Sequence, residues 1–341
     1  DDAKANPVSI YVERVVAKIG MTANQAVATT DGKYVFNITD GDYVLDAQKV
    51  KVRVVIDGWA VNAYNTNGYL VKKLNANWGT TAKPFDGWNN AADHRCYWAA
   101  DANYTSNGEN KYDFSKEEQT GTYKGLTYKT WNEVQNGGCA QDAYYFENTV
   151  APNAQAGNPD APTNVTTLLI AARIQTSNDN GTTWKSQDIY QKDGAYYTAE
   201  FLQKAFMNEF KGKFRWYDKT NATEYTSDLA LEDLTWDATI SSDNKSSVTI
   251  TVKSAQCKTT GHENAVLQKS TNSGWQTAKA TDLTAALTNS HFNTGLTGYK
   301  GGACYYQVPI EHLGTSGNTK NWGIVRNHIY RLTLSNINRI G

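Results

Sequence analysis

The sequence predicts a mainly β fold, a β-sandwich with long loops and two or more short helical insertions. Several segments alternate apolar and polar residues, which is the pattern of strands with one buried face. The 341 residues include 21 Tyr and 10 Trp, which favour strands, but only 6 Pro and 2 Met. Asn, Asp and Gly, the residues of tight turns, are frequent between the alternating segments. Apolar residues make up 40% of the chain, so a sizeable core can form.

The first alternating segment changes the face on which its apolar residues lie. Residues 8–12 place their apolar side chains at even positions, and residues 15–19 place them at odd positions. Glu13 and Arg14 separate the two halves. A change of parity within one strand predicts a β-bulge, which re-aims the side chains that follow.

The second alternating segment runs from Val50 to Ile56. Asp57-Gly58 follows it, and this dipeptide predicts a turn that ends the strand before another one begins at Trp59. Further strands are predicted at residues 165–174, 247–252 and 330–334.

Two segments have helical periodicity. The longer one runs from Thr198 to Lys211, and Gly212 is a suitable C-terminal cap. Its apolar stripe consists of Phe201, Leu202, Ala205, Phe206 and Phe210. The shorter one runs from Thr281 to Thr288, with Thr281 as the expected N-cap.

Residues 75–164 show little periodicity and are rich in turn formers. We interpret them as a loop-rich aromatic insertion within one elaborated domain that spans residues 1–341, and not as a separate domain. Four aromatic side chains of this insertion could anchor its loops or could line a sugar-binding platform. These are Trp78, Trp88, Trp98 and Tyr104.

Charge and hydropathy limit the class of partner. The formal net charge is −1, which argues against a nucleic-acid partner or an anionic membrane surface. No stretch approaches the roughly 20 apolar residues that span a bilayer. The chain starts at Asp1 without a signal peptide, so we expect a mature or trimmed product of a secreted protein.

The four cysteines are Cys96, Cys139, Cys257 and Cys304. None lies in a CxxC pair, and zinc sites usually show tighter ligand spacing. An even number in a secreted chain permits two disulfides, with three possible connectivities. Pairing by proximity along the chain joins the first cysteine to the second and the third to the fourth, and four buried thiols are the alternative.

No sequence pattern points to catalysis. The chain has no GxSxG, HExxH, P-loop or GxGxxG arrangement, and its histidines are scattered. A glycosidase needs two carboxylates, and two acidic pairs could supply them: Glu117-Glu118 and Glu232-Asp233. We interpret both pairs as solvated surface. Residues 40–42 and 179–181 lack the spacing of a calcium loop and are read as hairpin turns. We therefore predict no enzyme, no metal site and no cofactor.

Three segments carry a resemblance to a known family. They are residues 12–19, residues 52–72 and residues 306–334, with a weaker match at residues 145–149. Together they resemble the fimbrillin family, the shaft pilins of the type V fimbriae of Bacteroidales, and are most similar to the minor-fimbrium shaft subunits. The motif positions are Glu13, Arg14, Ala17, Lys18, Arg326, Asn327, His328 and Tyr330. The resemblance implies that these residues are structural.

The resemblance also implies a fold and a function. The fold would be the transthyretin-like β-sandwich of a pilin C-terminal domain, with the N-terminal domain and the final donor strand of the family pattern absent. The function would be that of a structural subunit on the bacterial outer membrane surface. Such subunits polymerise by donor-strand exchange after proteolytic processing and support adhesion. Partners would be identical subunits, accessory tip and anchor pilins, and host or bacterial surface receptors. A fimbrial tip or accessory adhesin and a secreted glycan-binding module are the alternatives.

Overall fold

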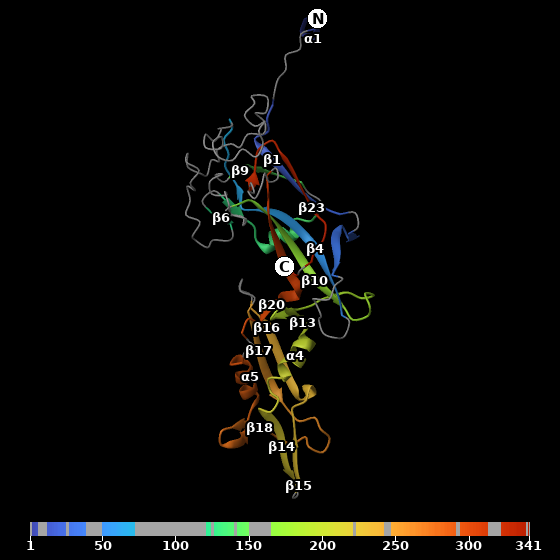
Figure 1. Ribbon diagram of the computed structural model, residues 1–341, viewed down its shortest axis with the longest axis vertical. Coiled ribbons are helices and arrows are strands. Elements are labelled where there is room, and N and C mark those ends of the chain that lie inside the picture. The colour runs from blue at the N-terminus through green and yellow to red at the C-terminus, as the bar shows by residue number, and fades with distance from the viewer. Residues whose placement is uncertain are drawn as a thin grey trace, which may run out of the picture.

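The computed structural model describes most of the chain outside residues 72–120. The described residues are 2–5, 12–24, 27–38, 50–71, 121–123, 126–139, 142–149, 165–220, 223–241, 247–290, 294–312, 322–338 and 340. They form a mainly β structure with several sheets and a few short helices, so the predicted fold class is confirmed. Figure 1 shows that these residues build an elongated molecule with two parts stacked along its long axis.

The upper part in Figure 1 contains two sheets. One has the order β23-β1-β8-β5-β7-β6. Its strands are β1 (Val16–Ala23), β5 (Tyr64–Asn65), β6 (Gly121–Tyr123), β7 (Leu126–Tyr128), β8 (Ala143–Phe146) and β23 (Ile329–Leu334). The other has the order β11-β10-β4-β3-β2, and β21 also pairs with β10. Its strands are β2 (Ala28–Thr30), β3 (Lys33–Ile38), β4 (Lys51–Asn62), β10 (Thr167–Ser177), β11 (Lys185–Ser186) and β21 (Ala303–Pro309).

Both sheets bury side chains in one hydrophobic cluster, which we call the upper cluster. Ile19 comes from β1, Ile56 from β4 and Ile170 from β10, and each is at most 1% exposed. Two sheets that share one core are consistent with the expected β-sandwich. Smaller elements of this part are α1 (Asp2–Ala5), α3 (Trp131–Asn136), β9 (Asn148–Thr149) and β22 (Gly323–Ile324).

The predicted turn at Asp57-Gly58 was wrong, because β4 runs continuously through these residues. The pairing of β4 with β10 shifts register here, with Gly58 opposite Ala171 and Ile56 opposite Ala172. Asp57 is therefore the extra residue of a β-bulge, and the buried positions change from even to odd after it. Its carboxylate is buried and forms ion pairs with Lys33 at 2.6 Å and Arg173 at 2.9 Å. The bulge expected at Glu13-Arg14 adjoins residues 6–11, which lie outside the described part.

The lower part has its own hydrophobic cluster, which we call the lower cluster. Two sheets and two helices surround it, with the strand orders β15-β14-β18-β19 and β16-β17. The elements are α4 (Ala199–Met207), β14 (Phe214–Thr220), β15 (Thr223–Ser227), η4 (Leu231–Asp233), β16 (Leu234–Ile240), β17 (Val248–Ala255), β18 (Val266–Thr271), β19 (Gly274–Thr277) and α5 (Ala280–Thr288).

Both predicted helices form, with different ends. In α4, Thr198 is the N-cap, and turns replace the last residues of the expected helix up to Gly212, whose φ is +71°. Phe201, Leu202 and Phe206 are buried as the apolar stripe predicts. In α5 the N-cap is Lys279 and not Thr281, because the Asp282 carboxylate accepts the Lys279 N–H at 2.8 Å.

A three-stranded sheet joins the two clusters. Its order is β13-β12-β20, and Figure 1 shows it between the upper and lower parts. The elements are β12 (Ile189–Lys192), β13 (Ala195–Tyr197), β20 (Thr297–Tyr299) and η5 (Lys300–Gly302). Ile189 belongs to the upper cluster and its neighbour Tyr190 to the lower one. Each face of this sheet thus covers a different core.

The predicted domain organisation remains a prediction. The two clusters are separate, but they share the sheet of β12, β13 and β20. Most of the expected insertion at residues 75–164, with its four candidate sugar-stacking aromatics, lies outside the described residues. The part of it that the structure describes contributes α3 and strands β6 to β9 to the upper part.

Candidate functional site: the junction of the first and last strands

The two segments that carry the strongest motif residues lie side by side. Strands β1 and β23 pair in parallel, with Lys18 opposite Ile329 (Figure 1). The N–H of Lys18 donates to the carbonyl of His328 at 2.9 Å. At the start of this pairing, the N–H of Asn327 donates to the carbonyl of Val16 at 3.0 Å, and the N–H of Arg14 donates to the Asn327 Oδ1 at 3.3 Å. The fold thus brings together residues that lie at opposite ends of the chain.

Strand β23 is the terminal strand of its sheet within the described part. Its even-numbered side chains pack against the upper cluster, and its odd-numbered side chains are exposed, as the alternation predicts. Since the ladder to β1 uses the carbonyls of His328 and Leu334, the backbone groups of Arg331 and Thr333 point away from β1. An edge strand of this kind can accept a further strand.

A charged group on the surface links three strands of this sheet. The Asp142 carboxylate, just before β8, lies 2.7 Å from the Lys18 Nζ and 3.8 Å from Arg331 Nη2. Its hydrogen bond and ion pair with Lys18 lower the pKa of the Asp142 carboxyl below its usual value. Gly20 leaves room for this carboxylate, since a Cβ at position 20 would lie 2.2 Å from the Asp142 Oδ1.

A buried ion pair lies behind the junction. The Nε of Arg326 donates to Oε1 of Glu147 at 3.0 Å, and both side chains are at most 2% exposed. Arg326 also donates to the carbonyl of Tyr69 at 2.7 Å and to that of Leu70 at 3.5 Å. One guanidinium therefore holds the chain after β5 against β9 and β22, while the Leu70 side chain is 84% exposed.

Two histidines complete the junction. The Tyr330 hydroxyl accepts the N–H of Val325 at 2.8 Å and is hydrogen-bonded to the Nδ1 of His312 at 2.6 Å. Burial raises the pKa of Tyr330. His328 lies with its Nδ1 2.8 Å from the carbonyl of Arg326, and its ring meets that of His312 at a centroid distance of 4.9 Å. These contacts fix the turn into β23.

Not every motif residue takes part in the junction. Ala17 is fully buried in the upper cluster, and Glu13 is exposed at the start of the described segment. The sequence indicated neither the pairing of Glu147 with Arg326 nor the role of His312. The only signal for Glu147 was its place in the weaker match at residues 145–149.

The expected proximity pairing of Cys257 with Cys304 does not occur in this structure. Cys139, Cys257 and Cys304 are buried thiols, with Cys257 in the lower cluster and the other two in the upper one. The Cys139 Sγ–H donates to the carbonyl of Ile56 at 3.7 Å, and burial raises the pKa of this thiol. Cys96 lies outside the described residues.

The acidic pair Glu232-Asp233 is only half solvated, so the reading as solvated surface was wrong for Asp233. Its carboxylate is buried and accepts three hydrogen bonds. The donors are the Trp216 Nε1 at 2.7 Å, the Ala230 N–H at 2.8 Å and the Lys258 N–H at 2.8 Å. This is a structural arrangement at the start of β16, with every donor supplied by the protein itself. Glu117-Glu118 and residues 40–42 lie outside the described part.

Residues 179–181 form part of the connection between β10 and β11. The Asp179 carboxylate accepts from the Ser177 hydroxyl at 2.6 Å and from the Thr183 N–H at 2.8 Å, and these bonds lower its pKa. Within the described residues, no group of three or more His, Cys, Asp or Glu side chains could hold a metal ion. In the same part of the chain, no helix is long and apolar enough to cross a membrane.

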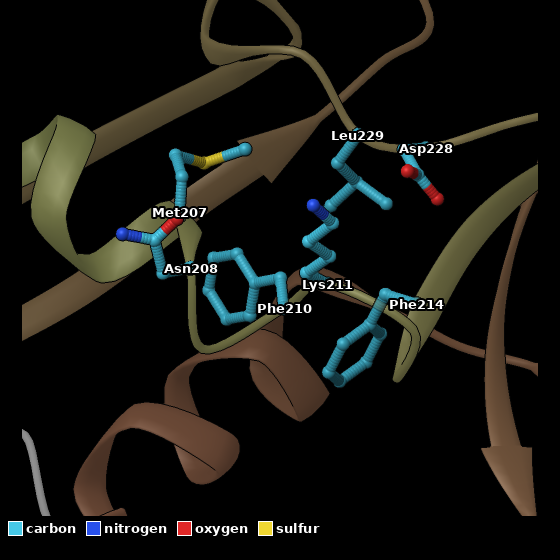
Figure 2. A pocket seen from close by; sticks show the side chains of 7 residues that line it. All are labelled: Met207, Asn208, Phe210, Lys211, Phe214, Asp228 and Leu229. Atoms are coloured by element: carbon cyan, nitrogen blue, oxygen red, sulfur yellow. The ribbon is translucent and has the colours of Figure 1, made fainter.

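A depression in the lower part is too small for most ligands. Figure 2 shows its lining, which comes from the end of α4, the start of β14 and the segment after β15: Met207, Asn208, Phe210, Lys211, Phe214, Asp228 and Leu229. Its volume is about 130 Å³, whereas small-molecule sites usually have volumes of about 300–1,000 Å³. It does not compete with the strand junction as the main functional feature.

One family model matches the chain. It is described as major fimbrial subunit protein type IV, fimbrillin, C-terminal, and it covers residues 297–341. The matched residues include β20, β21, β22 and β23, and therefore one strand of the junction. Among curated proteins, none matches the chain. The family match supports the role of a fimbrial subunit.

Proposed function

We propose that the chain is a structural subunit of a bacterial surface fimbria that polymerises by donor-strand exchange after proteolytic processing. The observation that carries this proposal is that residues 297–341 match a fimbrial subunit model and supply β23, an edge strand of its sheet. An edge strand offers backbone donors and acceptors to an extended segment of a neighbour.

The energetics of such a joint suit a fibre. Ten residues of added strand would direct about five side chains inward. At roughly 1.5–3 kcal/mol for each large apolar side chain, the gross gain is about 7–15 kcal/mol, which ordering entropy partly offsets. A joint of this strength dissociates slowly although no covalent bond holds it.

The proposed partners follow from the fibre. They are identical subunits, accessory tip and anchor pilins, and receptors on host or bacterial surfaces. The fibre would stand on the bacterial outer membrane surface and support adhesion there.

Electron microscopy of the exported precursor, before and after Arg-specific proteolysis, tests the proposal. We expect long fibres only after proteolysis, with the 341-residue chain alone as the control. A processed protein that caps existing fibres without forming its own would replace this proposal with a tip adhesin. A processed protein that neither forms fibres nor caps existing ones would exclude both fimbrial roles.

A proline at the edge strand tests where the added strand pairs. Thr333→Pro removes a backbone N–H that points away from β1, so the pairing of β1 with β23 is retained. If the neighbour pairs with β23, this variant folds but forms no fibres. Leu332→Pro, which removes an N–H that points toward β1, is the matched disruptive variant. Normal fibres from Thr333→Pro would exclude β23 as the acceptor edge.

A further inference from the structure

A second hollow lies beside the sheet that joins the two clusters. It has a volume of about 440 Å³, which lies within the range of about 300–1,000 Å³ usual for ligand sites. It is lined by Gln187, Asp188, Tyr190, Ala199, Trp236, Asp237 and Ala238. These residues come from the segment before β12, from β12 itself, from the first position of α4 and from the middle of β16. We call this hollow the waist groove.

The waist groove has two carboxylates, and no Lys or Arg is among its lining residues. Asp188 accepts the N–H of Gly301 at its Oδ1, at 2.6 Å. Asp237 forms an ion pair at its Oδ2 with Lys253, at 2.9 Å, and the side chains of this pair are 53% and 57% exposed. Within the described part of the chain, each carboxylate keeps a second oxygen without a partner. The lining of the groove therefore carries negative charge.

An indole and a phenol also line the groove. The Trp236 ring packs against Phe206 at a centroid distance of 5.1 Å, and the Trp236 side chain is partly exposed and lines the groove. The buried Tyr190 hydroxyl donates to the carbonyl of Ala238 at 3.4 Å. Burial, Asp188 and Asp237 together raise the pKa of Tyr190 to about 12. Both carboxylates therefore act on the Tyr190 hydroxyl, and the phenol stays neutral at pH 7.

We propose that the waist groove binds the guanidinium group of an arginine side chain presented by a peptide. A guanidinium is planar, so it can stack on the Trp236 ring while its N–H groups bond to the free oxygens of Asp188 and Asp237. A neutral sugar would stack on the indole but would leave the negative charge of the groove uncompensated. The amino end of α4 carries partial positive charge, but Glu200 in its first turn opposes that charge.

This inference does not depend on the proposed fimbrial role. None of the seven lining residues lies within the matched residues 297–341. Loss of binding at the groove would leave the proposal about strand exchange intact, and failure to form fibres would leave the groove intact.

Calorimetric titration of the 341-residue chain at low salt tests the inference. The probes are N-acetyl-arginine amide, its citrulline counterpart, N-acetyl-lysine amide, spermidine and a neutral trisaccharide. We expect saturable binding of the arginine probe and binding weaker by about fivefold or more for the isosteric but uncharged citrulline probe. Equal binding of the arginine and citrulline probes, tighter binding of spermidine or the trisaccharide, or no saturable binding of the arginine probe would overturn the inference.

Substitutions locate the binding. Asp188→Asn and Asp237→Asn keep an acceptor oxygen but remove the charge, and each should weaken arginine binding about two- to fivefold. Lys253→Met should strengthen it by a similar factor, because it releases the Asp237 carboxylate from its ion pair. Asp228→Asn, beside the smaller depression in Figure 2, is the matched control and should change nothing. The assignment would be contradicted if arginine binding were unchanged in Asp188→Asn and Asp237→Asn, or weaker in Lys253→Met.

Discussion

Arg326 and Glu147 form an ion pair that is buried on both sides, although 179 positions separate them in the chain. The pair is not isolated, because the Arg326 guanidinium also bonds to the carbonyls of Tyr69 and Leu70. It therefore ties three distant segments of the upper part together at the turn that leads into β23.

Removing the charge of Glu147 should destabilise the protein strongly. In Glu147→Gln the Arg326 cation stays buried without a counterion, so we expect a loss of about 3–5 kcal/mol in the free energy of unfolding. Urea denaturation measures this loss. The double variant Glu147→Gln with Arg326→Met should lose less than the sum of the two single losses, because no uncompensated charge remains.

An exposed pair provides the control for this prediction. Glu200 and Lys204 are four residues apart in α4, and their side chains are 62% and 41% exposed. Glu200→Gln should cost less than about 1 kcal/mol. Equal losses in Glu147→Gln and Glu200→Gln would show that the buried pair has no special role.

Gly58→Ala tests how closely α3 packs against the bulge in β4. A Cβ at position 58 would lie 2.5 Å from the Val134 carbonyl oxygen and 2.7 Å from the Gln135 carbonyl oxygen, both at the end of α3. Backbone atoms of a packed helix cannot move aside easily, so we expect a loss of about 1–3 kcal/mol, seen as a lower midpoint in thermal unfolding. Gly68→Ala meets only the Phe146 ring and should cost less. A larger loss in Gly68→Ala would refute this explanation.

These residues show which features a sequence can predict. The alternation in β23 and the stripe of α4 are local patterns, so their buried faces could be predicted without knowing the rest of the fold. The continuity of β4 could not, because it depends on its pairing with β10, which places Gly58 opposite Ala171, more than 100 residues further along. Likewise, Asp233 is buried because its donors come from Trp216 and Lys258, which lie on other elements. The Glu147–Arg326 pair escaped prediction for the same reason.

Ile189 and Tyr190 test the prediction of one elaborated domain. Ile189 packs into the upper cluster and Tyr190 into the lower one. If the shared sheet couples the clusters, Ile189→Ala and Tyr190→Ala should each lower hydrogen-exchange protection in both parts, at a cost of about 2–5 kcal/mol. If Ile189→Ala affects only the upper part and Tyr190→Ala only the lower part, the chain holds two independent domains.

Asp282 should make stability depend on pH. The ion pair with Lys269, at 2.7 Å, and the hydrogen bond from the Lys279 N–H lower the pKa of Asp282 in the folded protein. A carboxyl whose folded pKa is depressed stabilises the fold above its unfolded pKa of about 3.9. This stabilisation disappears as the pH falls through the folded value.

Asp282→Asn should therefore be less stable than the natural chain by about 0.5–1 kcal/mol at pH 7, since the amide loses the ion pair and the interaction with the start of α5. Urea midpoints of the two proteins, measured in steps from pH 7 to pH 3, should converge at the acidic end, where the Asp282 carboxyl begins to take up its proton. Asp228→Asn should show no such convergence, because the exposed Asp228 carboxylate forms no ion pair with any described residue. A difference between Asp282→Asn and the natural chain that stays constant down to pH 3 would mean that the Asp282 charge does not stabilise α5.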